Sequence, residues 1–127
     1  MSWDAYINTL MEAPNATDAA IYGLDGNLWA STCELKDITG EQINALTCEI
    51  SKLHACGPMI GKKKCMFLRK LDGDQDILQL KTKENPNISV CVGKTKKALV
   101  VLIGNAKPPE LTTKVFGVVK HLVDNNY

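Results

Sequence analysis

No apolar run in this sequence is long enough to cross a membrane as a helix. The longest covers residues 98–103, whereas a spanning helix needs roughly 20 apolar residues. The chain begins Met-Ser-Trp-Asp, without a basic stretch followed by an apolar one, so we expect no signal peptide. Low-complexity segments are also missing, and 45% hydrophobic against 23% charged residues excludes a disordered chain. We therefore expect a single domain, 1–127, that is not an integral membrane protein.

Residues for catalysis and metal binding are scarce as well. The five cysteines are odd in number and no two have C-x-x-C spacing, which favours reduced thiols in the cytoplasm over disulfides or a zinc site. Neither His54 nor His121 has a serine, cysteine or acid at the spacing of a triad or a ligand set. Asp72, Asp74 and Asp76 resemble the start of a calcium loop, but the glutamate that completes one is missing. We therefore expect a protein that is not an enzyme, with no catalytic residue, no bound metal and no cofactor.

The net charge is low but unevenly distributed. A formal charge of +1 excludes a chain that is drawn as a whole to nucleic acid or to a membrane. Residues 1–61 carry eight acids and two lysines, residues 62–97 carry ten basic and four acidic residues, and residues 98–127 are nearly balanced. The middle third is thus a basic region that could meet an acidic partner.

The hydrophobic pattern changes between helical and strand-like periods along the chain. Ser2 suits the N-cap of a first helix that ends near Pro14, and Thr39 begins a capping box for a second. Apolar runs typical of strands cover residues 19–24, 28–31, 64–71, 77–83, 88–92 and 98–103. Short connections, including the turn signal Asp25-Gly26, favour antiparallel hairpins. Pro108-Pro109 introduce a last helix, so we predict an α+β fold with helices covering an antiparallel sheet.

The few aromatic residues are concentrated near the ends of the chain. Trp3 and Tyr6 are one turn apart on the first helix, and His121 and Tyr127 belong to the last helix and its tail. Trp29 lies on a strand, so its face should alternate with those of its two neighbours. One interpretation is that Trp3 and Tyr6 simply pack the first helix onto the sheet. The other is an exposed aromatic strip that binds a polyproline II segment by ring stacking and hydrogen bonds.

Several blocks of the sequence resemble one known family. Residues 2–10, Ser-Trp-Asp-Ala-Tyr-Ile-Asn-Thr-Leu, resemble the amino-terminal signature small-W-x-x-Y-I/V-x-x-L of the profilins. The family's next block is similar in order and spacing to residues 19–30. Further similarities lie in residues 61–69, 80–83, 94–100, 121–122 and the final Tyr127. The resemblance covers the whole chain, and the first two blocks together are highly specific.

The resemblance implies a fold, a set of partners and a location. Profilins have a central antiparallel sheet, with the N- and C-terminal helices packed side by side on one face and further helix and strand elements on the other. They bind actin monomers and proline-rich segments, and many members bind phosphoinositides. The resemblance therefore implies a protein of the cytoplasm and cytoskeleton that regulates actin polymerisation. Its partners would be monomeric actin and proline-rich proteins such as elongation factors, and not nucleic acid.

The family's two binding surfaces map onto separate residues of this chain. The resemblance places the poly-proline site on the residues that the aromatic argument selected, with a leucine as apolar floor: Trp3, Tyr6, Trp29, His121, Leu122 and Tyr127. It places the actin site on strands of the basic region and on the start of the last helix: Lys64, Met66, Phe67, Leu68, Arg69, Lys81, Lys83, Ser89, Thr112, Thr113 and Phe116. For Phe67, packing in the core is an equally good interpretation.

Three other classes of protein stay open on the sequence alone. A small nucleic-acid-binding domain could use the basic region, but its strands lack the paired aromatics on which such sheets stack bases. A small hydrolase or transferase would need a buried polar cluster in a cleft, which no set of residues suggests. A longin-type scaffold protein has a similar layered plan, but it gives no reason for aromatics at positions 3, 6 and 29.

Overall fold

The computed structural model describes residues 3–13, 15–31, 38, 40–46, 59–60, 63–71, 76–83, 88–105, 108–125 and 127. Its elements in chain order are α1 (Trp3–Met11), β1 (Ala16–Gly23), β2 (Leu28–Ser31), α2 (Gly40–Leu46), β3 (Met59–Ile60), β4 (Lys63–Leu71), β5 (Asp76–Thr82), β6 (Ser89–Lys94), β7 (Ala98–Gly104) and α4 (Pro108–Asp124). The predicted helices and hairpins are present, with ends shifted by a few residues. The second helix, predicted from the capping box at Thr39, is present as α2, and the apolar stripe that follows it at Ile50 and Leu53 lies outside the described residues.

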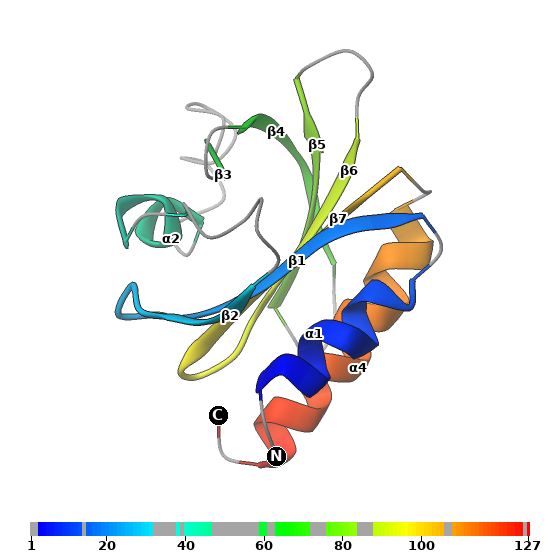
Figure 1. Ribbon diagram of the computed structural model, residues 1–127. Helices are drawn as coiled ribbons and strands as arrows, with labels where there is room; N and C mark the ends of the chain where they lie inside the picture. The colour runs from blue at the N-terminus through cyan, green and yellow to red at the C-terminus, as the bar shows by residue number, and fades with distance from the viewer. Residues whose placement is uncertain are drawn as a thin grey trace.

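The strands that the structure describes form one antiparallel sheet. Their order is β2-β1-β7-β6-β5-β4-β3, so the last strand returns to pair with the first along most of its length (Figure 1). The sequence pattern predicts the hairpins but not the pairing of β1 with β7, because that contact joins residues about eighty positions apart. The short strand β3 was not predicted either, since it follows a Gly-Pro pair that indicates only the end of a helix.

The two faces of the sheet carry two separate cores. Figure 1 shows α1 and α4 lying side by side on one face, with α2 on the other side of the sheet. Alternation along β7 divides its side chains between them: Val100 and Leu102 pack toward the terminal helices, whereas Leu99 and Val101 pack toward the other core. Both faces are covered and all of β7 is buried. This arrangement confirms the predicted α+β fold.

Helix α4 lies directly on β6, and α1 lies beside α4. A Cβ added at Gly93 would collide with the Val119 side chain and would lie 2.8 Å from a methyl carbon of Val115. A glycine in β6 therefore lets the helix approach the sheet closely. Lys114 of α4 and Glu12, just after α1, form an ion pair of 3.5 Å. None of the described helices is both long and apolar enough to cross a membrane.

Candidate functional site

Five rings from three parts of the chain gather near the start of α1 and the end of α4. We call this set, Trp3, Tyr6, Trp29, His121 and Tyr127, the aromatic patch. The ring centre of Trp3 lies 5.5 Å from that of Tyr6, 4.6 Å from that of Trp29 and 5.0 Å from that of Tyr127. Tyr6 is 5.4 Å from His121, and Trp29 is 6.0 Å from Tyr127. All five distances fall in the range of favourable ring contacts, and Trp3 is the centre of the set.

The rings of the aromatic patch differ in how much surface they present. Trp3 and Trp29 are half-buried, His121 is exposed and Tyr127 is 38% exposed. Tyr6 is only 7% exposed and Leu122 is fully buried, so Leu122 belongs to the core beneath the patch and its side chain presents no surface. The rings are tilted or edge-on to one another, with interplanar angles between 36° and 79°. The rings of the patch are therefore not coplanar and do not form one flat strip.

A break in strand pairing brings Trp29 into the patch. Ile21 pairs with Ala30 and Tyr22 pairs with Leu28, which leaves Trp29 as an extra residue in β2. Such a β-bulge turns a side chain away from its regular direction. Both Trp29 and Ala30 consequently pack against the core under the terminal helices. The expectation that Trp29 alternates strictly with its neighbours is wrong for this reason.

Gly23 leaves the space that the Trp29 indole occupies. A Cβ at this position would lie 3.0 Å from Trp29 Nε1 and 2.5 Å from Asp25 Oδ1. A side chain of any size would push against both groups. Asp25 itself accepts hydrogen bonds from the main-chain and side-chain nitrogens of Asn27, and Gly26 has a φ of 97°, which is the left-handed region that glycine tolerates. The predicted Asp-Gly turn thus also shapes the patch.

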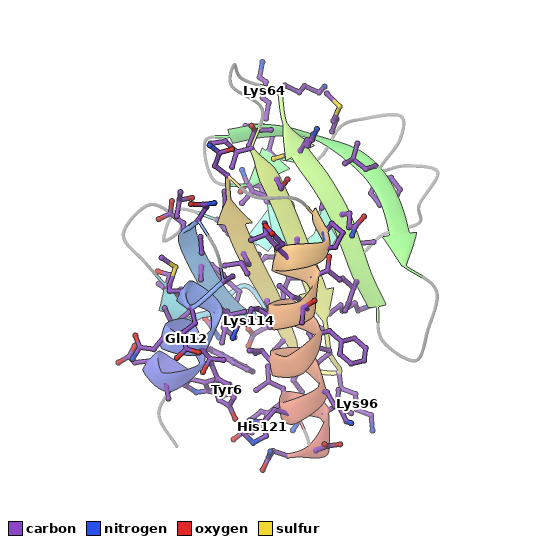
Figure 2. All side chains as sticks on the ribbon, turned by 90° about the vertical axis from the view of Figure 1, so that its right-hand side faces the viewer. Tyr6, Glu12, Lys64, Lys96, Lys114 and His121 are labelled. Atoms are coloured by element: carbon purple, nitrogen blue, oxygen red, sulfur yellow. The ribbon has the colours of Figure 1, made fainter. Side chains whose placement is uncertain are left out.

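A groove of about 480 Å³ between the terminal helices adjoins the aromatic patch. Tyr6 and His121 line both the groove and the patch, and Ala5, Thr9, Gly117 and Val118 continue the groove along α1 and α4. Figure 2 shows Tyr6 and His121 together at this end of the molecule, with Glu12 and Lys114 farther along the helices. The groove was not predicted, because its walls come from helices at opposite ends of the sequence.

A second surface lies on strands β4 and β5 and on the outer side of α4. We call its exposed and half-buried members the sheet–helix face: Lys64, Met66, Lys81, Lys83 and Phe116. Thr113, which the resemblance also assigned to this surface, lines the groove between the terminal helices instead. Met66 pairs directly with Lys81, so both point to the side of the sheet that α4 covers. Met66 is 38% and Phe116 48% exposed, which is high for large apolar side chains. Figure 2 shows Lys64 at the opposite end of the molecule from Tyr6 and His121.

Not all of the other residues that the resemblance assigned to this surface are exposed. Phe67 is buried in the core on the opposite face of the sheet, and Ser89 is buried as well, so neither side chain offers surface to a partner. Leu68 is exposed at a second β-bulge, between the pairs Phe67–Leu80 and Arg69–Gln79. Arg69 lies on β4, and its side chain is outside the described part of the structure. Strand residues alternate in direction, so residues 66–69 cannot all face one partner.

A polar contact holds the first half of α4 on the sheet. The Gln79 amide nitrogen donates a hydrogen bond of 2.9 Å to Thr112 Oγ1, and Cys91 Sγ lies 3.6 Å from the same oxygen. Thr112 is therefore an anchor of the helix, and we call these three residues the polar anchor. Burial raises the pKa of the Cys91 thiol to about 12 despite the opposing hydrogen bond from Thr112. No sequence signal pointed to this contact.

A family model described as Profilin matches residues 1–127. Human profilin-1 is 29% identical over 137 aligned positions, covering 98% of each chain. A profilin of Branchiostoma belcheri is 33% identical over 107 positions, covering 81% of this chain and 79% of that protein. Among solved structures, mouse profilin IIa in complex with a double repeat from the FH1 domain of mDia1 has a TM-score of 0.90 and 26% identity, with all of both chains covered.

Proposed function

This chain belongs to the profilin family, and from that premise we propose that it is a non-enzymatic adaptor of the cytoplasm and cytoskeleton. It binds monomeric actin on one surface and proline-rich segments on the other, and it thereby regulates actin polymerisation. The observation that carries the proposal is the aromatic patch, in which Trp3 contacts rings from the first helix, the first hairpin and the end of the chain.

The aromatic patch suits an extended proline-rich ligand. A polyproline II helix is already ordered before it binds, so little conformational entropy is lost. Its rings pack between half-buried indoles and the exposed Tyr127, while its free carbonyls accept hydrogen bonds from groups at the patch surface. The mouse profilin IIa structure with an FH1 repeat, which shares the fold at a TM-score of 0.90, supports this choice of ligand.

The sheet–helix face suits actin, and its members are residues that the resemblance assigns to the family's actin site. Phe116 and Met66 supply exposed apolar area, and the lysines beside them supply positive charge that favours an acidic partner. Lys64 of the sheet–helix face lies at the opposite end of the molecule from Tyr6 and His121 of the aromatic patch (Figure 2). Both ligands can thus bind at once, which raises the local concentration of actin near a proline-rich partner.

Retention on immobilised poly-L-proline, with elution by denaturant, tests the proline half of this proposal. A pyrene-actin polymerisation assay tests the other half, because a monomer binder lengthens the lag and raises the apparent critical concentration. Binding of both ligands is expected. Failure to bind poly-L-proline would contradict the assignment of the aromatic patch as the proline-binding site. An unchanged critical concentration would contradict the assignment of the sheet–helix face as the actin-binding site.

Phosphoinositides are proposed as a third ligand, at the lysines of the sheet–helix face. The Lys83 amide donates a hydrogen bond of 2.8 Å to the Lys64 carbonyl, which places these two exposed lysines side by side in the backbone. Each lysine near an anionic membrane surface contributes about 1 kcal/mol. Vesicles that contain phosphatidylinositol bisphosphate should therefore bind and should compete with actin. Equal binding to phosphatidylserine vesicles of matched charge would exclude headgroup selectivity.

A further inference from the structure

The turn between β6 and β7 holds the last residue of the chain in place. Thr95 is buried in this turn at 6% exposure. Its hydroxyl accepts hydrogen bonds from the Ala98 amide, at 2.9 Å, and from the Lys97 amide, at 3.3 Å. The same hydroxyl donates to the main-chain oxygen of Tyr127 at 2.8 Å. Figure 1 shows this turn, in yellow, close to the C-terminal end of the chain.

Two further hydrogen bonds fix the main chain of Tyr127. The Lys97 amide donates to the Tyr127 oxygen at 2.8 Å, and the Tyr127 amide donates to the Leu122 carbonyl at 2.9 Å. The residue is thus tied both to the end of α4 and to a turn of the sheet. Chain ends usually fray unless they are tied down in this way. With its main chain fixed, the Tyr127 ring contacts Trp3 and Trp29.

We propose that Thr95 is a positioning residue for proline-rich ligands, because its hydroxyl holds Tyr127 in the aromatic patch. The inference rests on the proposed function, since it concerns the same ligand. Thr95 does not touch the ligand itself. It removes the cost of ordering Tyr127 when the ligand binds, which is the usual benefit of a preorganised site.

The turn itself does not need the hydroxyl to close. The Thr95 amide donates to the Ala98 carbonyl at 2.8 Å, which is the main-chain bond of the hairpin. Replacing the hydroxyl by a methyl group removes the bond to Tyr127 and also the acceptor of the Ala98 and Lys97 amides, while the main-chain bond of the hairpin remains. A loss of affinity that comes from the turn would persist when the Tyr127 ring is absent, whereas a loss that comes from positioning Tyr127 would not.

The test is a double-mutant cycle with Thr95→Val and Tyr127→Ala, measured by titration of a proline decamer against tryptophan fluorescence. Thr95→Val should weaken binding roughly three- to tenfold, the range expected for ordering one side chain. Thr95→Ser, which keeps the hydroxyl, should restore it. In the Tyr127→Ala background, Thr95→Val should have no further effect, since the two residues act as one unit.

Thr17→Val is the matched control, since the Thr17 hydroxyl also donates to a main-chain oxygen, that of Ile103, at 3.1 Å. It should leave decamer binding unchanged. If the unmodified protein does not bind the decamer, the proposed function fails. If it binds and Thr95→Val binds equally well, or loses affinity equally in the Tyr127→Ala background, the role of Thr95 is overturned. If Thr95→Val does not fold, Thr95→Ala takes its place in the same cycle.

Discussion

The aromatic patch and the sheet–helix face are built in different ways. Every ring of the patch contacts another ring, and the supports behind it are a bulge, a glycine and a tethered chain end. The members of the sheet–helix face come from β4, from β5 and the residue that follows it, and from α4. The patch is ordered by contacts among its own side chains, whereas the face takes its order from the scaffold beneath it.

This difference predicts how ligand binding at the two surfaces responds to substitutions. Removing one ring of the patch also removes support for its neighbours, so the loss should be large and confined to one ligand. On the sheet–helix face, single side chains should contribute less each, while changes in the scaffold should matter more. The following experiments test this contrast.

The largest effect is expected for Trp3→Ala. The indole contacts Tyr6, Trp29 and Tyr127, and central aromatic residues of an interface often contribute about 2 kcal/mol or more. Binding of a proline decamer, measured by calorimetry, should weaken by about thirtyfold or more. Binding to actin should persist.

Phe116→Ala is the reciprocal variant, because it removes the exposed aromatic ring of the sheet–helix face. It should weaken actin binding by about 1–2 kcal/mol and leave decamer binding unchanged. If Trp3→Ala or Phe116→Ala loses affinity for both ligands while its urea midpoint is unchanged, the two surfaces are coupled and not separate.

Gly93→Ala should destabilise the scaffold that both surfaces share. The added methyl group would collide with Val119 and press on Val115, at a cost of about 1–3 kcal/mol in the free energy of unfolding. Since α4 carries both His121 and Phe116, binding of both ligands should fall. Urea denaturation measures the first effect.

Gly117→Ala is the matched control on α4. A Cβ at Gly117 meets no atom within 4 Å, and alanine is a better helix former than glycine. This variant should raise the free energy of unfolding by about 0.5–1 kcal/mol. Equal effects of the two substitutions would contradict the close packing of α4 on β6.

How well each surface could be predicted from the sequence follows from the same difference. Trp3 and Tyr6 are one helical turn apart, and the Asp-Gly turn fixes the hairpin of Trp29, so local pattern and resemblance together indicated the residues of the patch. The bulge at Trp29 was missed because it depends on the pairing of β1 with β2. Thr95 was missed because its partner is 32 residues away.

The sheet–helix face was harder to predict for a physical reason. The resemblance assigned consecutive strand residues to one binding site, but neighbouring residues of a strand point to opposite sides of the sheet. Phe67 is therefore in the far core and Met66 on the surface. Thr112 proved to be an anchor for α4, because Gln79 and Cys91 lie beneath it. Gln79 and Cys91 are brought together only by the pairing register of β5 with β6, which the sequence does not show.

The polar anchor under the sheet–helix face should make stability depend on alkaline pH. The Cys91 thiol has a pKa of about 12 in the folded protein, above its ordinary value of 9.0. The neutral thiol's contribution to the free energy of unfolding is fully present below pH 9. It is lost as the pH rises toward 12, because the thiol ionises in the unfolded chain before it ionises in the folded protein. From pH 8 to pH 10, the wild type should lose about 1.4 kcal/mol more than Cys91→Ala does.

Urea denaturation of both proteins at the two pH values measures this difference, and groups other than Cys91 cancel between them. At each pH, decamer binding by the folded wild type and by folded Cys91→Ala should be the same, since the anchor lies away from the patch. Parallel pH profiles of wild type and variant would show that the thiol ionises equally in both states.

The smallest effect is expected for single charges of the sheet–helix face. Lys64 and Lys96 are both exposed lysines of the basic region, and Figure 2 shows them at opposite ends of the molecule. Exposed charges at the rim of an interface act mainly on the association rate. Lys64→Glu should slow association with actin about two- to fivefold at low salt, and the difference should shrink as salt is added. Lys96→Glu changes the net charge equally but lies at the end of the molecule opposite Lys64, so stopped-flow traces should show little change. If both variants slow association equally, the whole protein's charge guides actin, and the lysines of the sheet–helix face have no special role.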